Sequence, residues 1–530
     1  MEKRWSPGQP VLTVLIALAT TLLLIAVSRR RKSRRRSPPG PWGWPVLGCI
    51  PLLGSLPHQT LAKFARKYGP LMSMKLGSVN VVVASSPKMA EEFLKTHDRI
   101  WASRYTSTAA RIVAYDGNDI VFSEYGSRWR YARKIFLLEL LTAKRISAFR
   151  AARKEEILRG INEAIDRSCG GVKPVSMDMI LGKIATNSIT RMLMNEGSLS
   201  EKAAKIKSSD YFQHTIKEAF SVLSTFYLGD YIPWLARFDP LGEKKKMYAV
   251  SKKCDELFQT ILDDHKMKLE ATRSQPEVVT ADKNKEQDLV DILLTRPRDG
   301  DGQYLTELEM KALILDVIFG GTDTNASSTE WGLSELLRNP DVMDKAQAEM
   351  DSVVGRERLV EESDLPNLPY LNAIVKETFR LHPVGPVLVP HMSTEDCEVQ
   401  GYKIPAKSRL FVNIYAIQRD PEVYERPLDF YPERFLGADH DKDVHGLNFD
   451  LLPFGSGRRV CPGKGLGLVM VQYMMALFIH TCNLRLPGDM KPQELDVEEI
   501  FGLSTPRRNP LQAIVTPRLL KDILVSHAET

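Results

Sequence analysis

Cysteine is scarce in this 530-residue sequence, and its six cysteines follow no pattern. Their spacing matches neither a zinc site nor a disulfide framework. They are scattered as Cys49, Cys169, Cys254, Cys397, Cys461 and Cys482. Such sparse thiols fit a reducing compartment.

The sequence also lacks internal repeats and a Pro/Gly/Ser-rich linker in its middle. Its length alone would allow two or three domains. Because no linker divides it, one large domain with an N-terminal appendage is the simpler prediction. An apolar content of 43% is ample for a large core.

An excess of positive charge is lacking outside the N-terminus. The net charge is +6, but residues 2–36 alone carry +8, which leaves −2 for the remainder. A nucleic-acid footprint is therefore not needed, and no nucleic-acid partner is expected. The basic run at residues 29–36 fits anionic membrane lipid better.

An uncharged, apolar stretch at residues 11–27 precedes that basic run. It is slightly shorter than the about 20 residues of a membrane-spanning helix, and Trp5 and Ser28 extend it to the interfaces. A cleaved signal peptide is the alternative, but its charge would precede the apolar segment. The sequence predicts a single transmembrane helix within residues 1–37, with residues 38–530 in the cytosol.

Helical patterns dominate the rest of the chain, so the predicted class is mainly α with small β-sheets. Helices are expected at residues 61–68 and 87–96, from residue 129, through most of 145–270, at 306–338 and at 466–478. A hairpin is expected from strands at 71–76 and 79–84, and further strands at 398–413. Residues 105–125 have no clean period and are expected to form a loop region.

The most informative stretch is residues 454–463, which reads FGSGRRVCPG. A lone cysteine is usually a small buried hydrophobe, but these glycines let the backbone approach a flat ligand closely. Pro462 suits the first position of the helix that follows, so Cys461 would lie at the positive helix end, where a thiolate is favoured. A thiolate there can ligate a metal, and Arg459 can offset acidic groups on the same ligand.

This stretch resembles the haem-binding signature F-x-x-G-x-R-x-C-x-G of the cytochromes P-450. The matching positions are Phe454, Gly457, Arg459, Cys461 and Gly463. The resemblance implies haem b, with Cys461 as the iron ligand and the other four residues around the cofactor. A proline-rich run at residues 38–45, expected to be a stiff spacer, also resembles the hinge of microsomal members. It implies an enzyme anchored in the endoplasmic reticulum membrane.

A second match lies in the helix expected from residue 129. Trp129 and Arg133 are four residues apart and share a helix face, which alone could be an ordinary solvated basic face. In the family, W-x-x-x-R hydrogen-bonds a haem propionate. The resemblance therefore assigns both residues to cofactor binding.

A third match is Gly320-Gly321-Thr322-Asp323-Thr324, inside the helix expected at residues 306–338. Two glycines would leave a groove for a ligand, or could simply be a helix-packing pair. Activation of dioxygen needs protons without flooding by water, and Thr324 could donate them while Asp323 resupplies them. The family pattern departs here only at Asn325, where a hydroxyl residue is usual.

A fourth match joins two distant segments. Glu377 and Arg380 form the family's E-x-x-R, and Pro432-Glu433-Arg434-Phe435 forms its P-E-R-F element. The resemblance implies a structural network of Glu377, Arg380 and Arg434 that holds the cysteine loop.

The leading hypothesis is therefore a membrane-anchored haem-thiolate monooxygenase of the plant biosynthetic type. It would use dioxygen, with electrons from NADPH through an NADPH–haemoprotein reductase, because no second nucleotide-binding motif is visible. A haem-thiolate isomerase or dehydratase and a non-catalytic haem sensor are the alternatives. The intact pair Asp323–Thr324 argues against the former.

The substrate pocket is expected, by family position, at residues 112–122, 313–319, 384–389 and 502–505. These segments are largely apolar, with few charges expected to point inward. They suit a small apolar or aromatic secondary metabolite, a phenylpropanoid, flavonoid or terpenoid, without choosing among these classes.

Overall fold

The computed structural model describes residues 37–194, 210–239, 241–274, 287–295, 305–520 and 523. The transmembrane helix expected within residues 1–37 falls almost wholly outside this part of the chain, as does the basic run after it. Among the described residues, no helix combines the length and the apolar character needed to cross a bilayer.

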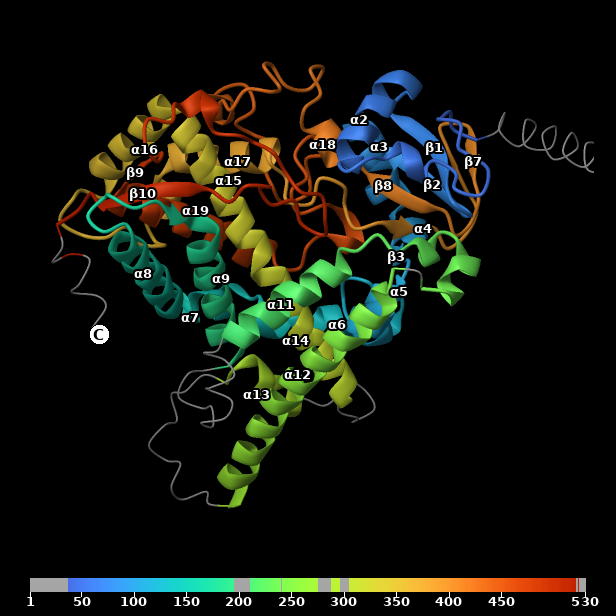
Figure 1. Ribbon diagram of the computed structural model, residues 1–530, viewed down its shortest axis with the longest axis horizontal. Helices are drawn as coiled ribbons and strands as arrows, with labels where there is room; N and C mark the ends of the chain where they lie inside the picture. The colour runs from blue at the N-terminus through green and yellow to red at the C-terminus, as the bar shows by residue number, and fades with distance from the viewer. Residues whose placement is uncertain are drawn as a thin grey trace, which may run out of the picture.

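A small β region forms one end of the molecule (Figure 1). Its five-stranded sheet has the order β1-β2-β8-β5-β3. The strands are β1 (Leu71–Leu76), β2 (Val79–Ala84), β8 (Arg409–Val412), β5 (His391–Met392) and β3 (Ser103–Arg104). Only β2 and β8 pair in parallel; the other neighbours are antiparallel. The hairpin expected from β1 and β2 is confirmed with its predicted bounds.

Two smaller sheets complete the β structure. The strands β4 (Val175–Ser176), β10 (Gln512–Pro517) and β9 (Cys482–Arg485) form one, and β6 (Cys397–Val399) and β7 (Tyr402–Ile404) form the other. Around the five-stranded sheet lie α2 (Pro57–Tyr68), α3 (Pro87–Glu91) and α18 (Ile414–Ile417) (Figure 1). α2 begins four residues earlier than expected because Pro57 occupies its first turn.

The larger, helical part is built around α14 (Glu307–Gly321), α15 (Asp323–Arg338) and α19 (Lys464–Thr481). α14 and α19 are apolar on nearly every face, as expected for helices buried in a core. Against them pack α8 (Arg150–Arg167), α9 (Met177–Leu193), α16 (Pro340–Val353) and α17 (Pro369–Leu381). α11 (Asp210–Leu223) and α12 (Glu243–Ser274) lie across the lower side in Figure 1.

The prediction of one continuous helix at residues 306–338 is wrong, because the structure divides it into α14 and α15. Thr322 has φ −99° and ψ −78°, which separates α14 from α15 directly after the two glycines. Glycines lower helix propensity, so this is where a long helix breaks at least cost. The start of α14 is fixed by a capping box between Thr306 and Glu309.

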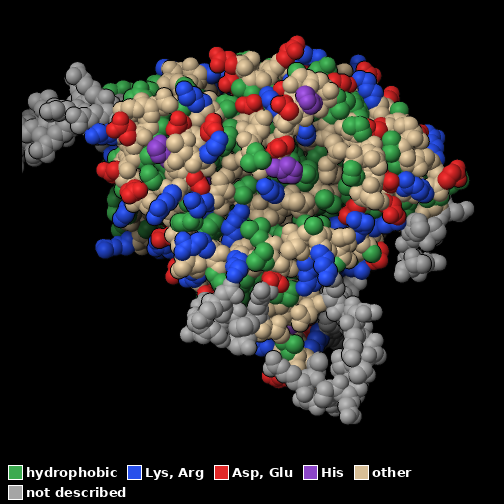
Figure 2. All heavy atoms as spheres, turned by 180° about the vertical axis from the view of Figure 1, so that it is seen from behind, with side chains coloured by type: hydrophobic (Ala, Val, Ile, Leu, Met, Phe, Trp, Pro, Cys, Tyr) green, Lys and Arg blue, Asp and Glu red, His purple; other side chains and the backbone are tan. Residues whose placement is uncertain are grey.

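The loop region expected at residues 105–125 is only partly irregular. It contains α5 (Thr108–Val113), whose N-terminus is capped by the Ser107 side chain, and a short turn at Tyr115–Gly117. The helix expected at residues 87–96 is α3 followed by a wider helical turn at Glu92–Thr96. On the face seen in Figure 2, acidic and basic side chains are interspersed.

Candidate active site

A cavity of about 340 Å³ lies between α14, α15, the start of α19 and the segments near residues 120, 388 and 460. Its lining is largely apolar, with Phe122, Phe136, Phe220, Val317, Phe319 and Leu503 among its members. All four segments expected to form the pocket contribute residues. Few inward charges were expected, and Asp119 and Asp316 are the charged residues of these four segments that line the cavity.

The cysteine loop closes one side of this cavity. Cys461 lines it, and the Cys461 backbone N–H donates to the carbonyl of Phe454 at 2.9 Å. Gly457 has φ +70°, and a Cβ there would lie 2.2 Å from the carbonyl oxygen of Leu94. Only glycine fits this position, so the turn that presents Cys461 depends on it.

The start of the following helix differs from the expectation. α19 begins at Lys464, with Gly463 as its N-cap, so Pro462 lies outside the helix. Burial raises the pKa of the Cys461 thiol, while the Gly463 N–H and the Arg133 charge lower it in part. The helix end alone therefore does not produce a thiolate, and a coordinated metal would have to complete the deprotonation.

Two predicted cofactor residues meet on α6 (Ser127–Ile135). The guanidinium of Arg133 lies 5.4 Å from the Trp129 ring centre and donates to the carbonyl of Val460 at 2.7 Å. Arg459 lies 4.3 Å from the same ring and donates to the carbonyls of Ala102 and Ser123, both at 2.6 Å. The structure thus brings Trp129, Arg133 and Arg459 to one side of the cavity.

Arg104 and His391 also line the cavity, and neither belongs to the motifs found in the sequence. They lie on paired strands, β3 and β5, which directly face each other in the sheet. Arg104 donates to the carbonyl of Val389, and its Nε has no hydrogen-bond partner. Burial lowers the pKa of Arg104 and of His391 well below their ordinary values. No local sequence pattern marks either residue.

The charge of this wall fits an acidic ligand. The cavity is lined by Arg104, Arg133 and Arg459, against Asp119 and Asp316. Burial raises the pKa of Asp119 to about 7 and that of Asp316 well above its ordinary value, so the acids offset these cations only in part. A buried excess of positive charge with an unpartnered Arg104 Nε fits the two propionates of haem.

The opposite wall carries Thr324, Asn325 and Ser328. Thr324 Oγ1 donates to the carbonyl of Gly320 at 2.8 Å, one helical turn earlier. A Cβ on Gly320 would meet nothing within 4 Å, whereas one on Gly321 would lie 2.4 Å from Ile189. Both glycines line the cavity, but only Gly320 has open space beside it, whereas Gly321 packs against Ile189.

Asp323 does not share the position of Thr324. It is not among the residues that line the cavity, and its carboxylate accepts a hydrogen bond from Ser504. Burial raises the pKa of Asp323, which the bond from Ser504 lowers only in part. The acid and the alcohol are neighbours in sequence, but only the alcohol faces the cavity.

The predicted network of Glu377, Arg380 and Arg434 is present. Arg380 donates to the Glu377 carboxylate from Nε at 2.7 Å and from Nη2 at 2.9 Å. Arg434 Nε donates to the same carboxylate at 3.2 Å. Arg380 also donates to the carbonyl of Gln418, whose side-chain oxygen accepts from Leu452 N–H. Since Leu452 lies two residues before Phe454, the network supports the start of the cysteine loop.

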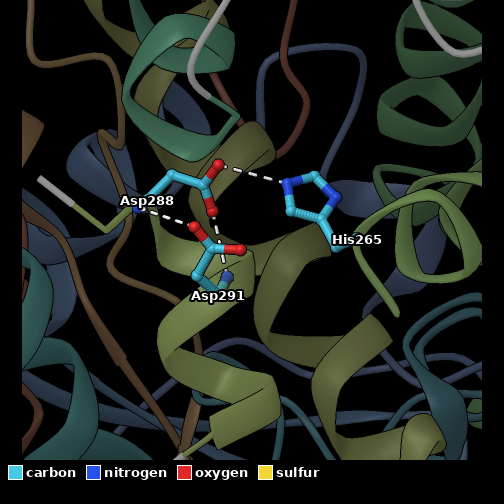
Figure 3. Close-up of side chains that lie close together, drawn as sticks. All are labelled: His265, Asp288 and Asp291. Carbon is cyan, nitrogen blue, oxygen red and sulfur yellow. Dashed lines mark hydrogen bonds and ion pairs between the residues drawn. The ribbon is translucent and has the colours of Figure 1, made fainter. Parts of the chain in front are cut away.

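A separate polar cluster of His265, Asp288 and Asp291 does not line this cavity (Figure 3). His265 Nε2 lies 3.1 Å from Asp288, and Nδ1 lies 2.8 Å from the carbonyl of Ile261. Burial lowers the pKa of His265, but the bond and charge of Asp288, the Ile261 carbonyl and the charge of Asp291 together outweigh it, so the pKa is raised. Asp288 and Asp291 cap each other's backbone N–H at the start of α13 (Leu289–Thr295). These contacts account for the cluster as packing between α12 and α13.

Comparisons with known proteins agree with this site. The sequence model of the cytochrome P-450 family matches residues 38–511. The chain is 40% identical to a flavonoid 3',5'-hydroxylase of Solanum melongena and to a flavonoid 3'-monooxygenase of Arabidopsis thaliana, covering 92% of each chain in both cases. It is also 40% identical to a trimethyltridecatetraene synthase of Zea mays, over 96% of this chain and 93% of that protein.

A solved structure shares the fold. A zebrafish cytochrome P-450 structure with progesterone superposes with a TM-score of 0.70 at 25% identity, covering 87% of this chain and 99% of the other. The cysteine loop and the cationic wall line the same cavity, and the family model spans all of their residues. The chain belongs to the cytochrome P-450 family and is a P-450 monooxygenase.

Proposed function

We propose that this monooxygenase hydroxylates a flavonoid or a closely related phenylpropanoid. The observation that carries the proposal is the 40% identity to flavonoid hydroxylases over nearly the whole chain. The cavity adds physical support, because aromatic and aliphatic side chains such as Phe122, Phe220 and Phe319 suit a flat aromatic molecule.

Haem would be held by the cysteine loop and by the cationic side of the cavity. Cys461 would ligate the iron, and Arg133 and Arg459, joined by Arg104, would bind the propionates, with Trp129 and His391 lying beside them. Phe454, Gly457 and Gly463 shape the loop that approaches the macrocycle. When bound, haem supplies a thiolate-ligated iron that activates dioxygen.

The chain itself would control protons and water. Thr324 places a hydroxyl on the cavity wall beside Gly320, and this hydroxyl donates to the Gly320 carbonyl until the side chain rotates. Asp323, held by Ser504 behind that wall, would resupply the proton from a carboxyl whose pKa is raised. The apolar lining would exclude other water from the reacting centre.

Electrons and location belong to the same proposal. NADPH would act through a haemoprotein reductase, which would dock on a basic face of α6. Arg128, Arg130 and Lys134 are exposed there. Residues 1–37 would anchor the enzyme in the endoplasmic reticulum membrane, with residues 38–530 as the cytosolic catalytic domain.

A terpenoid is the second candidate substrate class. Its support is the equal identity to the trimethyltridecatetraene synthase, whose name describes a tetraene product. An apolar cavity accepts either class, so the lining does not decide between them.

The deciding experiment is turnover of the membrane-bound enzyme with reductase and NADPH on matched panels of flavonoids and acyclic terpenoids. The expected result is a flavonoid product with one added oxygen, which carries label when labelled dioxygen is supplied. Turnover of terpenoids alone would overturn the substrate class. A product formed without reductase or dioxygen would favour an isomerase or dehydratase.

A further inference from the structure

The backbone of one residue, Ile120, contacts both α14 and the cationic side of the cavity. Its N–H donates to Asp316 Oδ2 on α14 at 2.6 Å. Its carbonyl accepts from Trp129 Nε1 at 3.1 Å and from Arg459 Nη1 at 3.0 Å. One short strap, residues 119–123, therefore contacts α14 on one side and Arg459 on the other.

Asp316 is placed to govern this strap. It lies four residues before Gly320, so it shares the helix face that opens into the cavity. Its side chain is 8% exposed and lines the cavity, and the Ile120 N–H that it accepts is buried. A buried N–H without an acceptor is unfavourable, so the strap stays in place only while residue 316 offers an oxygen.

Asp119 reinforces the same strap from within. Its Oδ2 accepts the Phe122 N–H at 2.8 Å, which folds the strap into a tight turn, and its Oδ1 has no partner. The charge of Asp119 adds to burial in raising the pKa of Asp316, while the charge of Arg459 acts on Asp119 in the opposite sense. The two acids and Arg459 therefore form one electrostatic unit across the strap.

We propose that Asp316 is a positioning residue. Through the backbone of Ile120 it fixes the position of α14, which lines the substrate cavity, relative to Trp129 and Arg459 on the haem side. Substrate affinity and haem retention are then linked properties, set by the hydrogen bonds of one carboxylate to the strap. The substrate half of this proposal rests on the proposed function; the haem half rests only on the family.

The test uses the haem-loaded full-length enzyme and three variants of α14. Asp316→Asn keeps an acceptor oxygen, Asp316→Ala removes it, and the matched control Val317→Ala enlarges the same cavity and leaves the Asp316 carboxylate in place. Two quantities are measured: the rate of haem transfer to excess apomyoglobin, and the Kd of a flavonoid from the spin-state change of the ferric haem.

Asp316→Ala is expected to raise both the haem-loss rate and the Kd by about tenfold, the effect of one unsatisfied buried donor. Asp316→Asn should stay near the wild type in both. Val317→Ala should change the Kd alone. Haem loss at the wild-type rate in Asp316→Ala would overturn the proposal, as would an Asn variant as impaired as the Ala variant.

A double-mutant cycle tests the link itself. Trp129→Phe removes the indole donor to the Ile120 carbonyl, so its effect on haem loss should be less than additive with that of Asp316→Ala. Additive effects would mean that the two residues act independently. If Asp316→Ala does not incorporate haem, Asp316→Glu, which displaces the strap without releasing it, should raise both quantities together. A change in only one of them would refute the link.

The two hypotheses fail in different ways. If no flavonoid perturbs the wild-type spectrum, the proposed substrate class is wrong, and the haem-loss cycle still tests the strap. If flavonoids bind and the cycle is additive, the substrate class survives and the role of Asp316 does not.

Discussion

Thr324 shows how much can depend on one hydroxyl. Its Oγ1 lies on the cavity wall and bonds to Gly320, while the neighbouring Asp323 faces Ser504 instead. The amide of Asn325 bonds to the Gly321 carbonyl at 2.7 Å and also lines the cavity. Thr324 is therefore the nearest hydroxyl to Gly320, and Asn325 is the nearest other donor.

Thr324→Val keeps the volume and removes the donor. We expect haem binding and substrate affinity to change little, because the residue contacts neither the cysteine nor the cationic wall. Without a controlled proton, NADPH consumption should persist while product per NADPH falls severalfold and hydrogen peroxide rises. Measuring product, NADPH and peroxide together checks this.

Ser328→Ala is the matched control, because Ser328 is a second hydroxyl residue on the same wall, one turn further along α15. Its coupling should equal that of the wild type. Unchanged coupling in Thr324→Val would instead point to Asn325 as the proton donor.

At the scale of elements, the contact between α17 and the turn Pro432–Leu436 supports the cysteine loop. Glu377, Arg380 and Arg434 are fully or almost fully buried. Removing one partner of a buried ion pair leaves uncompensated charge, at a cost of about 3–5 kcal/mol. Glu377→Ala should therefore yield protein with little haem, seen as a loss of the reduced carbon monoxide band.

Lys95→Ala is the control for that experiment. Lys95 and Glu91 form an exposed pair at 2.6 Å on the protein surface. Water and salt screen such pairs, so haem content and unfolding in urea should be unchanged. Normal haem loading in Glu377→Ala would show that the network does not support the loop.

The sequence predicted those elements whose signals are local. The β1–β2 hairpin follows from alternating residues around Gly77-Ser78, and α19 from the apolar run at residues 466–478, although Pro462 is not its first residue as expected. The Glu377 network was predictable because two short motifs carry it. Each of these features depends on residues that are close in sequence or on a fixed pattern.

The rest depends on tertiary contacts. Asp316 and Ile120 are 196 positions apart, and Arg104 and His391 become neighbours only when β3 and β5 pair. Nothing beside Asp119 or Asp316 in the sequence marks these two acids as the ones that line the cavity. The glycines before Thr322 show where the long helix can break, but not that it does, since the segments on either side are both good helices.

At the scale of the whole molecule, buried acids make the stability depend on pH. Burial raises the pKa of Glu330 to about 7, while its bond from Leu511 N–H opposes the shift. The folded state thus holds a proton that the unfolded state releases near 4.5, so Glu330 destabilises the fold increasingly from about pH 4.5 up to about pH 7.

Glu330→Gln keeps the acceptor and removes the titration. Relative to the wild type, this variant should gain stability as the pH rises from 5 to 8, by roughly 3 kcal/mol at most. The measurement is the unfolding midpoint at several pH values.

Glu335 is the control, because its pKa is shifted in the opposite direction. Burial raises that pKa, but the contacts with His382 and Arg338 lower it overall. Glu335→Gln should show a constant loss over this range, because its contribution disappears only below about pH 4.5. Parallel curves for both variants would contradict the assignment of Glu330.

The boundary of the catalytic domain is also a property of the whole molecule. The backbone of Ser73 on β1 donates to the carbonyl of Pro39 at 2.7 Å, and its Oγ donates to Pro38 at 2.6 Å. Further along, Cys49 N–H donates to the carbonyl of Lys75 at 2.6 Å. The chain from Pro38 onward therefore belongs to the sheet that carries Arg104 and His391.

Two truncations separate the anchor from this sheet. Removing residues 1–37 should leave every one of these bonds intact, so the protein should bind haem, show the reduced carbon monoxide band and no longer require detergent as an integral membrane protein, though it could remain peripherally attached. Removing residues 1–48 takes away the partners of Ser73 and uncovers the edge of β1, so haem content and stability should fall.

Both variants are compared with the full chain by membrane fractionation at high salt and alkaline pH and by the carbon monoxide spectrum. Integration that survives the loss of residues 1–37 would contradict a single N-terminal anchor, and equal haem content in both variants would place the domain boundary after residue 48.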